Sequence, residues 1–192
     1  LPFPARELIS IEKYYEIGEG HGPSQKKYTP ILSSRGCPYQ CTFCTPKLWN
    51  RRYRVRSAEN IVSEIEECII KYDIREFQFE DENLTVDKKR TIEICKNIIN
   101  KNLNIRWQTP NGIRASVTDN EMLDLMKESG CHHITVAPES GSQRVLNEII
   151  NKKQDLSKVT EVVEHASKIG MKTAAYFVIG LPGEKFEEAE MS

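Results

Sequence analysis

Short apolar segments alternate with longer amphipathic segments along most of this chain. In the longer segments apolar residues recur at helical spacing, as at Ile61, Ile65, Cys68 and Ile69. Five strands are predicted from the short segments, at residues 28–33, 76–79, 104–109, 132–137 and 172–179. Helices are predicted at residues 58–72, 87–100, 120–129, 142–150 and 157–169, and a further helix opens at residue 184.

This alternation of strand and helix indicates a parallel sheet. Thr118 and Glu121 suit a capping box for helix 120–129, and Gly130 suits its end. Five units connected in the right-handed sense curl into part of a βα barrel, whereas a complete eight-unit barrel needs about 250 residues. We therefore expect an α/β fold that is a partial, open βα barrel, with the open sheet of a flavodoxin-like domain as the alternative.

The first 30 residues have a different character. They carry four prolines and a glycine-rich stretch around His21, so residues 1–30 are predicted to be an extended lead-in and His21 a solvated loop residue. Residues 31–192 are predicted to form one core domain. The chain starts with leucine and stops in what resembles the first turns of a helix, so we expect a piece of a longer protein.

Composition limits the functional classes. With 192 residues, 39% of them hydrophobic, and a net charge of -1, the chain can bury one core, and its overall charge does not imply nucleic acid as a partner. No apolar run approaches the roughly 20 residues that span a membrane, and the start lacks the features of a signal peptide. We expect a cytoplasmic protein with reduced thiols and no membrane partner.

Cys37, Cys41 and Cys44 form a CxxxCxxC loop directly after the first predicted strand. Three thiolates in one short loop can hold three corners of a [4Fe-4S] cubane, whereas most protein clusters use four cysteines. One iron would then be open to a small molecule. A ferredoxin-type electron carrier would need a fourth cysteine nearby in the sequence.

Zinc and disulfides are the other interpretations of the cysteines. A structural zinc site normally shows paired CxxC knuckles or a downstream histidine pair, and this sequence has neither. Six cysteines in 192 residues are too few for a disulfide framework. We expect Cys68, Cys95 and Cys131 to be small buried hydrophobic residues.

The remaining polar and glycine-rich segments follow the other predicted strands, at residues 80–83, 111–114, 138–142 and 180–184. Ligands bind at this end of the strands in βα barrels. Together with the cysteine loop, these segments resemble the core of the radical S-adenosylmethionine (SAM) superfamily over about residues 28–184. The resemblance implies a [4Fe-4S] cluster whose open iron binds SAM. The reduced cluster then cleaves SAM to a 5′-deoxyadenosyl radical that takes hydrogen from the substrate.

The resemblance also assigns residues to SAM. Glu80, Asp81 and Glu82 occupy the Gly-Gly-Glu position that meets the SAM ammonium group, although both glycines are replaced, and a solvated acidic turn is the alternative. Glu139 and Ser140 match residues that bind the ribose and the amino-acid part of SAM.

Three further residues are assigned in the same way. Arg114 suits the SAM carboxylate, unless it is an ordinary surface arginine. Phe43 is the aromatic residue expected near the adenine, and Gly180 lies where the backbone reads the adenine edge. Ser142 as the cap of a helix start is a competing explanation for the Glu-Ser-Gly-Ser string.

A basic run of four arginines follows the cysteine loop, at Arg51, Arg52, Arg54 and Arg56. It suits an anionic substrate or RNA, and a solvated charged face is the alternative.

Within the superfamily, the chain is similar to cobalamin-dependent (class B) methylases and to anaerobic magnesium-protoporphyrin ester cyclase-like proteins, a group that extends to methylthiotransferase and Elongator types. This similarity implies methylation, cyclisation or a related modification of an unidentified substrate, an upstream cobalamin domain, and an electron donor such as flavodoxin or ferredoxin. An iron-sulfur electron-transfer or scaffold module without SAM chemistry is the alternative function.

Overall fold

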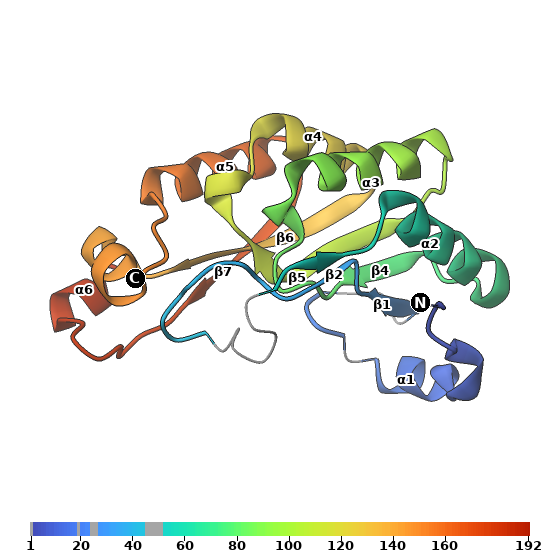
Figure 1. Ribbon diagram of the computed structural model, residues 1–192, viewed down its shortest axis with the longest axis horizontal. Helices are drawn as coiled ribbons and strands as arrows, with labels where there is room; N and C mark the ends of the chain where they lie inside the picture. Colours follow the sequence, from blue (N-terminus) through green and yellow to red (C-terminus); the bar gives the residue numbers. More distant parts are fainter. Residues whose placement is uncertain (1, 19, 24–26, 45–51) are drawn as a thin grey trace.

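The computed structural model describes residues 2–18, 20–23, 27–44 and 52–192. Five parallel strands form one sheet in the order β1 (Tyr28–Ile31), β4 (Glu76–Phe79), β5 (Arg106–Ile113), β6 (Cys131–Glu139) and β7 (Lys172–Phe177). Helices α2 (Ala58–Tyr72), α3 (Lys88–Asn100), α4 (Asn120–Glu128) and α5 (Leu156–Lys168) cover one face of this sheet (Figure 1). The predicted α/β fold of five parallel strand-helix units is confirmed, with β1 and β7 at the two edges of an open sheet.

The core lies between the sheet and the four helices. Phe79 and Trp107, on neighbouring strands, meet edge to face with ring centroids 5.1 Å apart. The Trp107 indole nitrogen donates a hydrogen bond to the Ser129 carbonyl oxygen, 3.1 Å away, so the ring is buried without an unsatisfied donor. Three cysteines are buried in this core, as predicted: Cys68, Cys95 and Cys131.

The start of α4 differs from the predicted capping box. Asp119, in an extended conformation, is the N-cap, and its side chain accepts a hydrogen bond from the Met122 N–H. The Thr118 hydroxyl instead donates to the Arg114 carbonyl oxygen, and Glu121 pairs with Lys88. The predicted capping box of Thr118 and Glu121 is therefore wrong, because Asp119 lies one residue closer to the helix.

The lead-in is not extended throughout, contrary to the prediction for residues 1–30. It contains a short 3-10 helix, η1 (Arg6–Leu8), and the helix α1 (Ile11–Ile17). Ile11 and Tyr15, one helical turn apart, pack against the core, and Gly18 ends the helix at a positive φ of 69°. His21 also has protein partners, since its backbone N–H donates to Gln78 Oε1 at 3.2 Å and its ring nitrogen Nδ1 lies 3.1 Å from Glu80 Oε2.

A short antiparallel ribbon flanks the cysteine loop and was not predicted. It consists of β2 (Ser34–Arg35) and β3 (Arg54–Val55). Of the predicted basic run, Arg51 lies outside the described residues, Arg52 is exposed and Arg54 lies in β3. The remaining short elements are η3 (Leu84–Val86), η4 (Ala115–Val117), the π-helix η5 (Val145–Ile149) and α6 (Phe186–Glu190). None of the helices in the described ranges is both long enough and apolar enough to cross a membrane.

Candidate cofactor site

The cysteine loop is held between the ends of two distant segments. Near its start, the Gly36 N–H donates to Glu82 Oε2 at 3.1 Å, just after β4. Farther along, Thr42 bonds to the end of η5, with its N–H 2.9 Å from the Ile150 oxygen and its hydroxyl 2.8 Å from the Ile149 oxygen. These contacts fix the loop across the carboxyl ends of the strands, where ligands bind in this architecture.

All three cysteines of the loop line one cavity of about 160 Å³. The other lining residues come from the cysteine loop itself, from the ends of β4, β5 and β6 and from the turn after η5. They are Tyr39, Phe43, Glu82, Asn83, Asn111, Gly112, Ile113, Arg114, Ala137, Glu139 and Lys152. Seven of the sequence-predicted site residues therefore come together here: Cys37, Cys41, Cys44, Phe43, Glu82, Arg114 and Glu139.

The cysteine side chains suit a cubane cluster. All six cysteines of the chain are thiols. Burial raises the pKa of Cys37, and the neighbouring Cys41 and Cys44 add to this, whereas a hydrogen bond from the Tyr39 backbone and the positive charge of Arg114 oppose the shift. These groups therefore lie within electrostatic reach of one another. Within the described ranges, no three His, Cys, Asp or Glu side chains converge as ligands of a single metal ion. A cubane instead spreads its cysteine ligands over different irons.

A distortion of β5 brings polar groups to the cavity. Thr109 pairs with Ile134 of β6 and Ile113 pairs with Val136, so the register shifts between Thr109 and Ile113. Asn111 and Gly112 lie in the distorted stretch and line the cavity. Gly112 has a φ of 96°, a conformation that a residue with a Cβ adopts only with strain.

Glu139 at the end of β6 is the strained residue of the site. Its φ is 69°, in the left-handed region that side chains other than glycine seldom occupy. Its carboxylate forms a buried ion pair with Lys152, with Oε1 2.8 Å from Nζ. Lys152 was not among the site residues predicted from the sequence. The only indication of its role there is its position in the turn after the helix that follows Glu139.

Arg114 is buried and has protein partners on several sides. Its Nη2 donates to the Lys152 carbonyl oxygen, its Nε donates to Ser116 Oγ at 2.8 Å, and its guanidinium carbon lies 3.9 Å from the centroid of the Tyr39 ring. The alternative of a surface arginine is wrong. Arg114 links the cysteine loop, through Tyr39, to the turn that carries Lys152.

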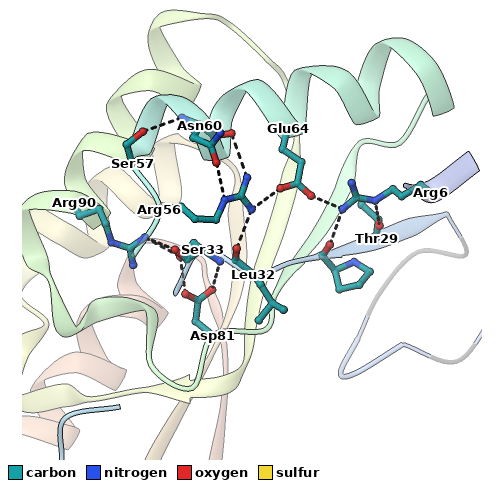
Figure 2. Close-up of polar contacts among 11 residues, drawn as sticks. Arg6, Thr29, Leu32, Ser33, Arg56, Ser57, Asn60, Glu64, Asp81 and Arg90 are labelled. Atoms are coloured by element: carbon teal, nitrogen blue, oxygen red, sulfur yellow. Dashed lines mark hydrogen bonds and ion pairs between the residues drawn. The ribbon is translucent and has the colours of Figure 1, made fainter. Parts of the chain in front are cut away.

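Asp81 does not line the cavity. Its buried carboxylate accepts hydrogen bonds from the Ser33 N–H at 3.1 Å and the Ser33 hydroxyl at 2.6 Å (Figure 2). It also accepts a hydrogen bond from the Ser34 hydroxyl. Arg90 donates to the Ser33 hydroxyl at 2.9 Å. Burial raises the pKa of Asp81, and these hydrogen bonds oppose the shift. Asp81 thus holds the segment that leads into the cysteine loop.

Three other predicted residues also lie outside the lining of this cavity. Glu80 Oε2 accepts a hydrogen bond from Asn111 Nδ2 at 2.9 Å, next to its contact with His21. The Ser140 hydroxyl accepts from the Ser142 N–H at 3.1 Å, and Gly180 is exposed, its N–H donating to Glu184 Oε2 at 2.7 Å. The alternative of a solvated acidic turn at residues 80–82 is wrong, since each of the three carboxylates accepts a hydrogen bond from a protein donor.

Comparison with known proteins gives the family. The family model described as "Radical SAM superfamily" matches residues 31–192. Cytidylyl-2-hydroxyethylphosphonate methyltransferase of Streptomyces wedmorensis is 36% identical over 201 residues, which cover 100% of this chain and 37% of the relative. Anaerobic magnesium-protoporphyrin IX monomethyl ester cyclase of Rubrivivax gelatinosus is 29% identical over 184 residues, which cover 95% of this chain and 32% of that protein. The chain thus spans about a third of the length of these relatives.

The solved structures agree in fold. The radical SAM methyltransferase TsrM from Kitasatospora setae superposes with a TM-score of 0.79 at 20% identity, over 93% of this chain and 33% of that one. Proteins of this superfamily use a [4Fe-4S] cluster and SAM. The chain belongs to the radical SAM superfamily of enzymes.

Proposed function

We propose that Cys37, Cys41 and Cys44 hold three irons of a [4Fe-4S] cluster and that the cavity beside them binds SAM. The observation that supports this most strongly is that the three thiols share one cavity with charged side chains of both signs. Glu82 and Glu139 suit the ammonium group of SAM, and Lys152 and Arg114 suit its carboxylate. A cluster held by these cysteines and reduced by one electron would supply that electron for cleavage of SAM to methionine and a 5′-deoxyadenosyl radical.

The protein's own groups prepare the cavity for this ligand. Glu82 anchors the start of the cysteine loop through the Gly36 N–H, so one side chain both positions the loop and faces the cavity. The strained φ of Glu139 directs its carboxylate to Lys152, and both groups are held in the cavity lining before SAM arrives. Phe43 is 41% exposed and lines the cavity beside the thiols, where an aromatic ring can pack against the adenine of SAM.

For the whole protein we propose methyl transfer or ring closure on a substrate, by analogy with the named relatives. An upstream cobalamin-binding domain and a flavodoxin or ferredoxin as electron donor complete this proposal, and we place the protein in the cytoplasm. Natural full-length protein that shows no cobalamin absorbance after expression with the cofactor supplied would count against the cobalamin domain.

Electron paramagnetic resonance tests the central proposal. The protein is reconstituted anaerobically with iron and sulfide, reduced with dithionite and measured with and without SAM. We expect a reduced [4Fe-4S] signal that shifts on addition of SAM. A signal indifferent to SAM in the natural full-length protein would favour an electron-transfer or scaffold module.

Two variants make the measurement specific. Cys41→Ala should lose the cluster signal, because a ligand of the open-iron cluster is gone. Cys95→Ala removes a thiol buried in the core and should keep both the signal and its response to SAM.

A further inference from the structure

A second and larger cavity lies on the other side of the end of β4. This cleft has a volume of about 1220 Å³ and is bounded by the lead-in, by β1, by the β2–β3 ribbon, by the start of α2, and by Gln78 and Glu80. Its volume is slightly above the roughly 300–1,000 Å³ that is usual for small-molecule pockets, so it is large enough for a small organic ligand. None of its lining residues also lines the cysteine cavity.

Two arginines are held together at the ribbon side of this cleft. Arg35 of β2 is the direct register partner of Arg54 of β3, and both are exposed and line the cleft. Directly opposed residues of an antiparallel pair lie on the same face with Cβ atoms about 5 Å apart, and like charges in that position destabilise the pair. A ribbon of only two residues on each strand that keeps two guanidinium groups opposed is suited to an anion between them.

The inner wall of the cleft carries a buried donor without a partner. The Gln78 side chain is 2% exposed, and its Oε1 accepts from the His21 N–H. Its Nε2 has no hydrogen-bond partner among the described residues. Because a buried donor left unsatisfied costs free energy, an acceptor on a ligand in the cleft would stabilise the complex through this group.

Apolar side chains separate these polar groups. Ile9, Leu32 and Val55 line the cleft and are exposed at 52%, 44% and 49%. Arg56 also lines the cleft and is paired with Glu64. The cleft therefore offers an apolar surface with a cationic rim at the ribbon and a hydrogen-bond donor at the inner wall.

The cleft and the cysteine cavity meet at one side chain. Glu80 lines the cleft, and its Oε2 accepts from Asn111 Nδ2, whose residue lines the cysteine cavity. A ligand in the cleft would lie next to the proposed SAM site. We propose that this cleft binds the substrate, and that the substrate carries an anionic group, a carboxylate or a phosphate, on an apolar body. Its identification as the substrate site rests on the proposed function, whereas binding of such a ligand does not.

Fluorescence binding tests this assignment on the purified chain. The anionic probe 1-anilinonaphthalene-8-sulfonate is compared with the uncharged N-phenyl-1-naphthylamine. We expect the double variant R35Q/R54Q to bind the anionic probe at least about tenfold more weakly and to bind the uncharged probe as the wild type does. The variant K89Q/K96Q, which removes the same charge from exposed positions on α3, should leave both affinities unchanged. Equal loss in both double variants, or none in R35Q/R54Q, overturns the proposal.

Competition distinguishes the anionic groups and the two cavities. Dodecanoate and monododecyl phosphate should displace the anionic probe at concentrations where dodecanol does not, and the stronger competitor identifies the preferred group. In reconstituted protein the probe should leave the SAM-induced shift of the cluster signal intact, because the cavities are distinct. Loss of that shift would place the probe in the cysteine cavity and overturn the assignment. Cys41→Ala protein should still bind the probe, so failure of the cluster proposal is separable from failure of the cleft.

Discussion

Arg6 Nη2 lies 2.6 Å from Glu64 Oε1, and Arg56 Nη1 lies 2.5 Å from the other oxygen of the same carboxylate (Figure 2). The three residues come from the lead-in, from α2 and from the segment after β3. Glu64 is 1% exposed and Arg6 is 7% exposed, so the pair between them is shielded from water. One buried carboxylate thus fastens both the lead-in and the exit of the cysteine segment to the helical layer.

Replacing Glu64 should therefore destabilise the protein. In Glu64→Gln two guanidinium groups face a neutral amide, and Arg6 stays buried without its counter-charge. We expect the free energy of unfolding in urea to fall by about 3 kcal/mol. Glu66 lies on the same helix as Glu64 and forms a more exposed pair with Lys101. Glu66→Gln should therefore lower the free energy of unfolding by less than about 1 kcal/mol. Equal losses of unfolding free energy in the two variants would show that burial of the Glu64 ion pairs adds nothing to stability.

Asp81 gives a prediction that separates a structural role from SAM binding. Asp81→Asn puts an amide where three donors from Ser33 and Ser34 now meet two carboxylate oxygens. We expect a loss of about 2 kcal/mol or more in stability, and a lower iron content after reconstitution because the entry to the cysteine loop is displaced. SAM affinity per loaded cluster, measured by titration of the cluster signal, should equal that of the wild type. Asp73→Asn, at an exposed position, is the matched control. Weakened SAM affinity in otherwise stable Asp81→Asn protein would restore Asp81 to the SAM site.

Glu139 and Lys152 should act as a unit. Glu139→Gln and Lys152→Met each leave one member of a buried pair without its partner, so each should lower stability, and the double variant should lose less than the sum of the two. A coupling of about 1–3 kcal/mol in a double-mutant cycle of urea unfolding would meet this expectation. SAM affinity of the loaded protein should fall in both single variants. Additive stability losses would show that the observed contact carries no net interaction.

The pKa of His132 predicts that the stability of the protein depends on pH. Burial, with the positive charge of Arg106 adding to it, lowers the pKa of His132 from its ordinary 6.5 to about 4. Glu76 Oε1 lies 3.5 Å from His132 Nε2, and Arg106 Nε lies 3.5 Å from the other oxygen of the same carboxylate. As pH falls from 6.5 towards 4, the unfolded chain gains a proton at this position and the folded chain does not, so stability decreases.

The measurement is urea unfolding across this pH range for the wild type and for His132→Gln. This group contributes a slope of at most about 1.4 kcal/mol per pH unit. The wild type should lose stability more steeply than the variant between pH 6.5 and 4. The two should respond alike above pH 7, where the imidazole is neutral in both states. Parallel profiles throughout would show that the His132 pKa is not lowered.

The elements with a regular pattern were predictable from the sequence. Helix α2 and strand β4 have the predicted bounds, since a sustained apolar face and a short buried run are both local signals. The β2–β3 ribbon escaped prediction because two residues per strand are too few to show a period of two. Helix α1 escaped because its contact with the core depends mainly on Ile11 and Tyr15, and such a pair is not distinctive within a proline-rich segment.

The candidate site likewise contains residues that the sequence predicts and residues that it does not. The three cysteines form a local motif, and the strand ends that face them followed from the predicted topology. Lys152 was not predictable, because its contact with Glu139 depends on how the chain turns after the π-helix η5. Nothing in the sequence showed that Asp81 and Glu82 have different roles. Neighbouring acidic residues look alike in a sequence, but beyond the end of a strand their side chains point to different surroundings.

The two edge strands of the sheet, β1 and β7, differ in how readily their outer edges can pair with another strand. At the edge of β1, Pro30 has no N–H to offer, and its carbonyl oxygen is already bonded to Arg6 Nη2 at 3.1 Å. In β7 Tyr176 and Phe177 are 43% and 42% exposed, and among the described residues no strand pairs with its outer edge. Among the described residues, β1 is therefore better protected than β7 against pairing of its edge with a strand of another molecule.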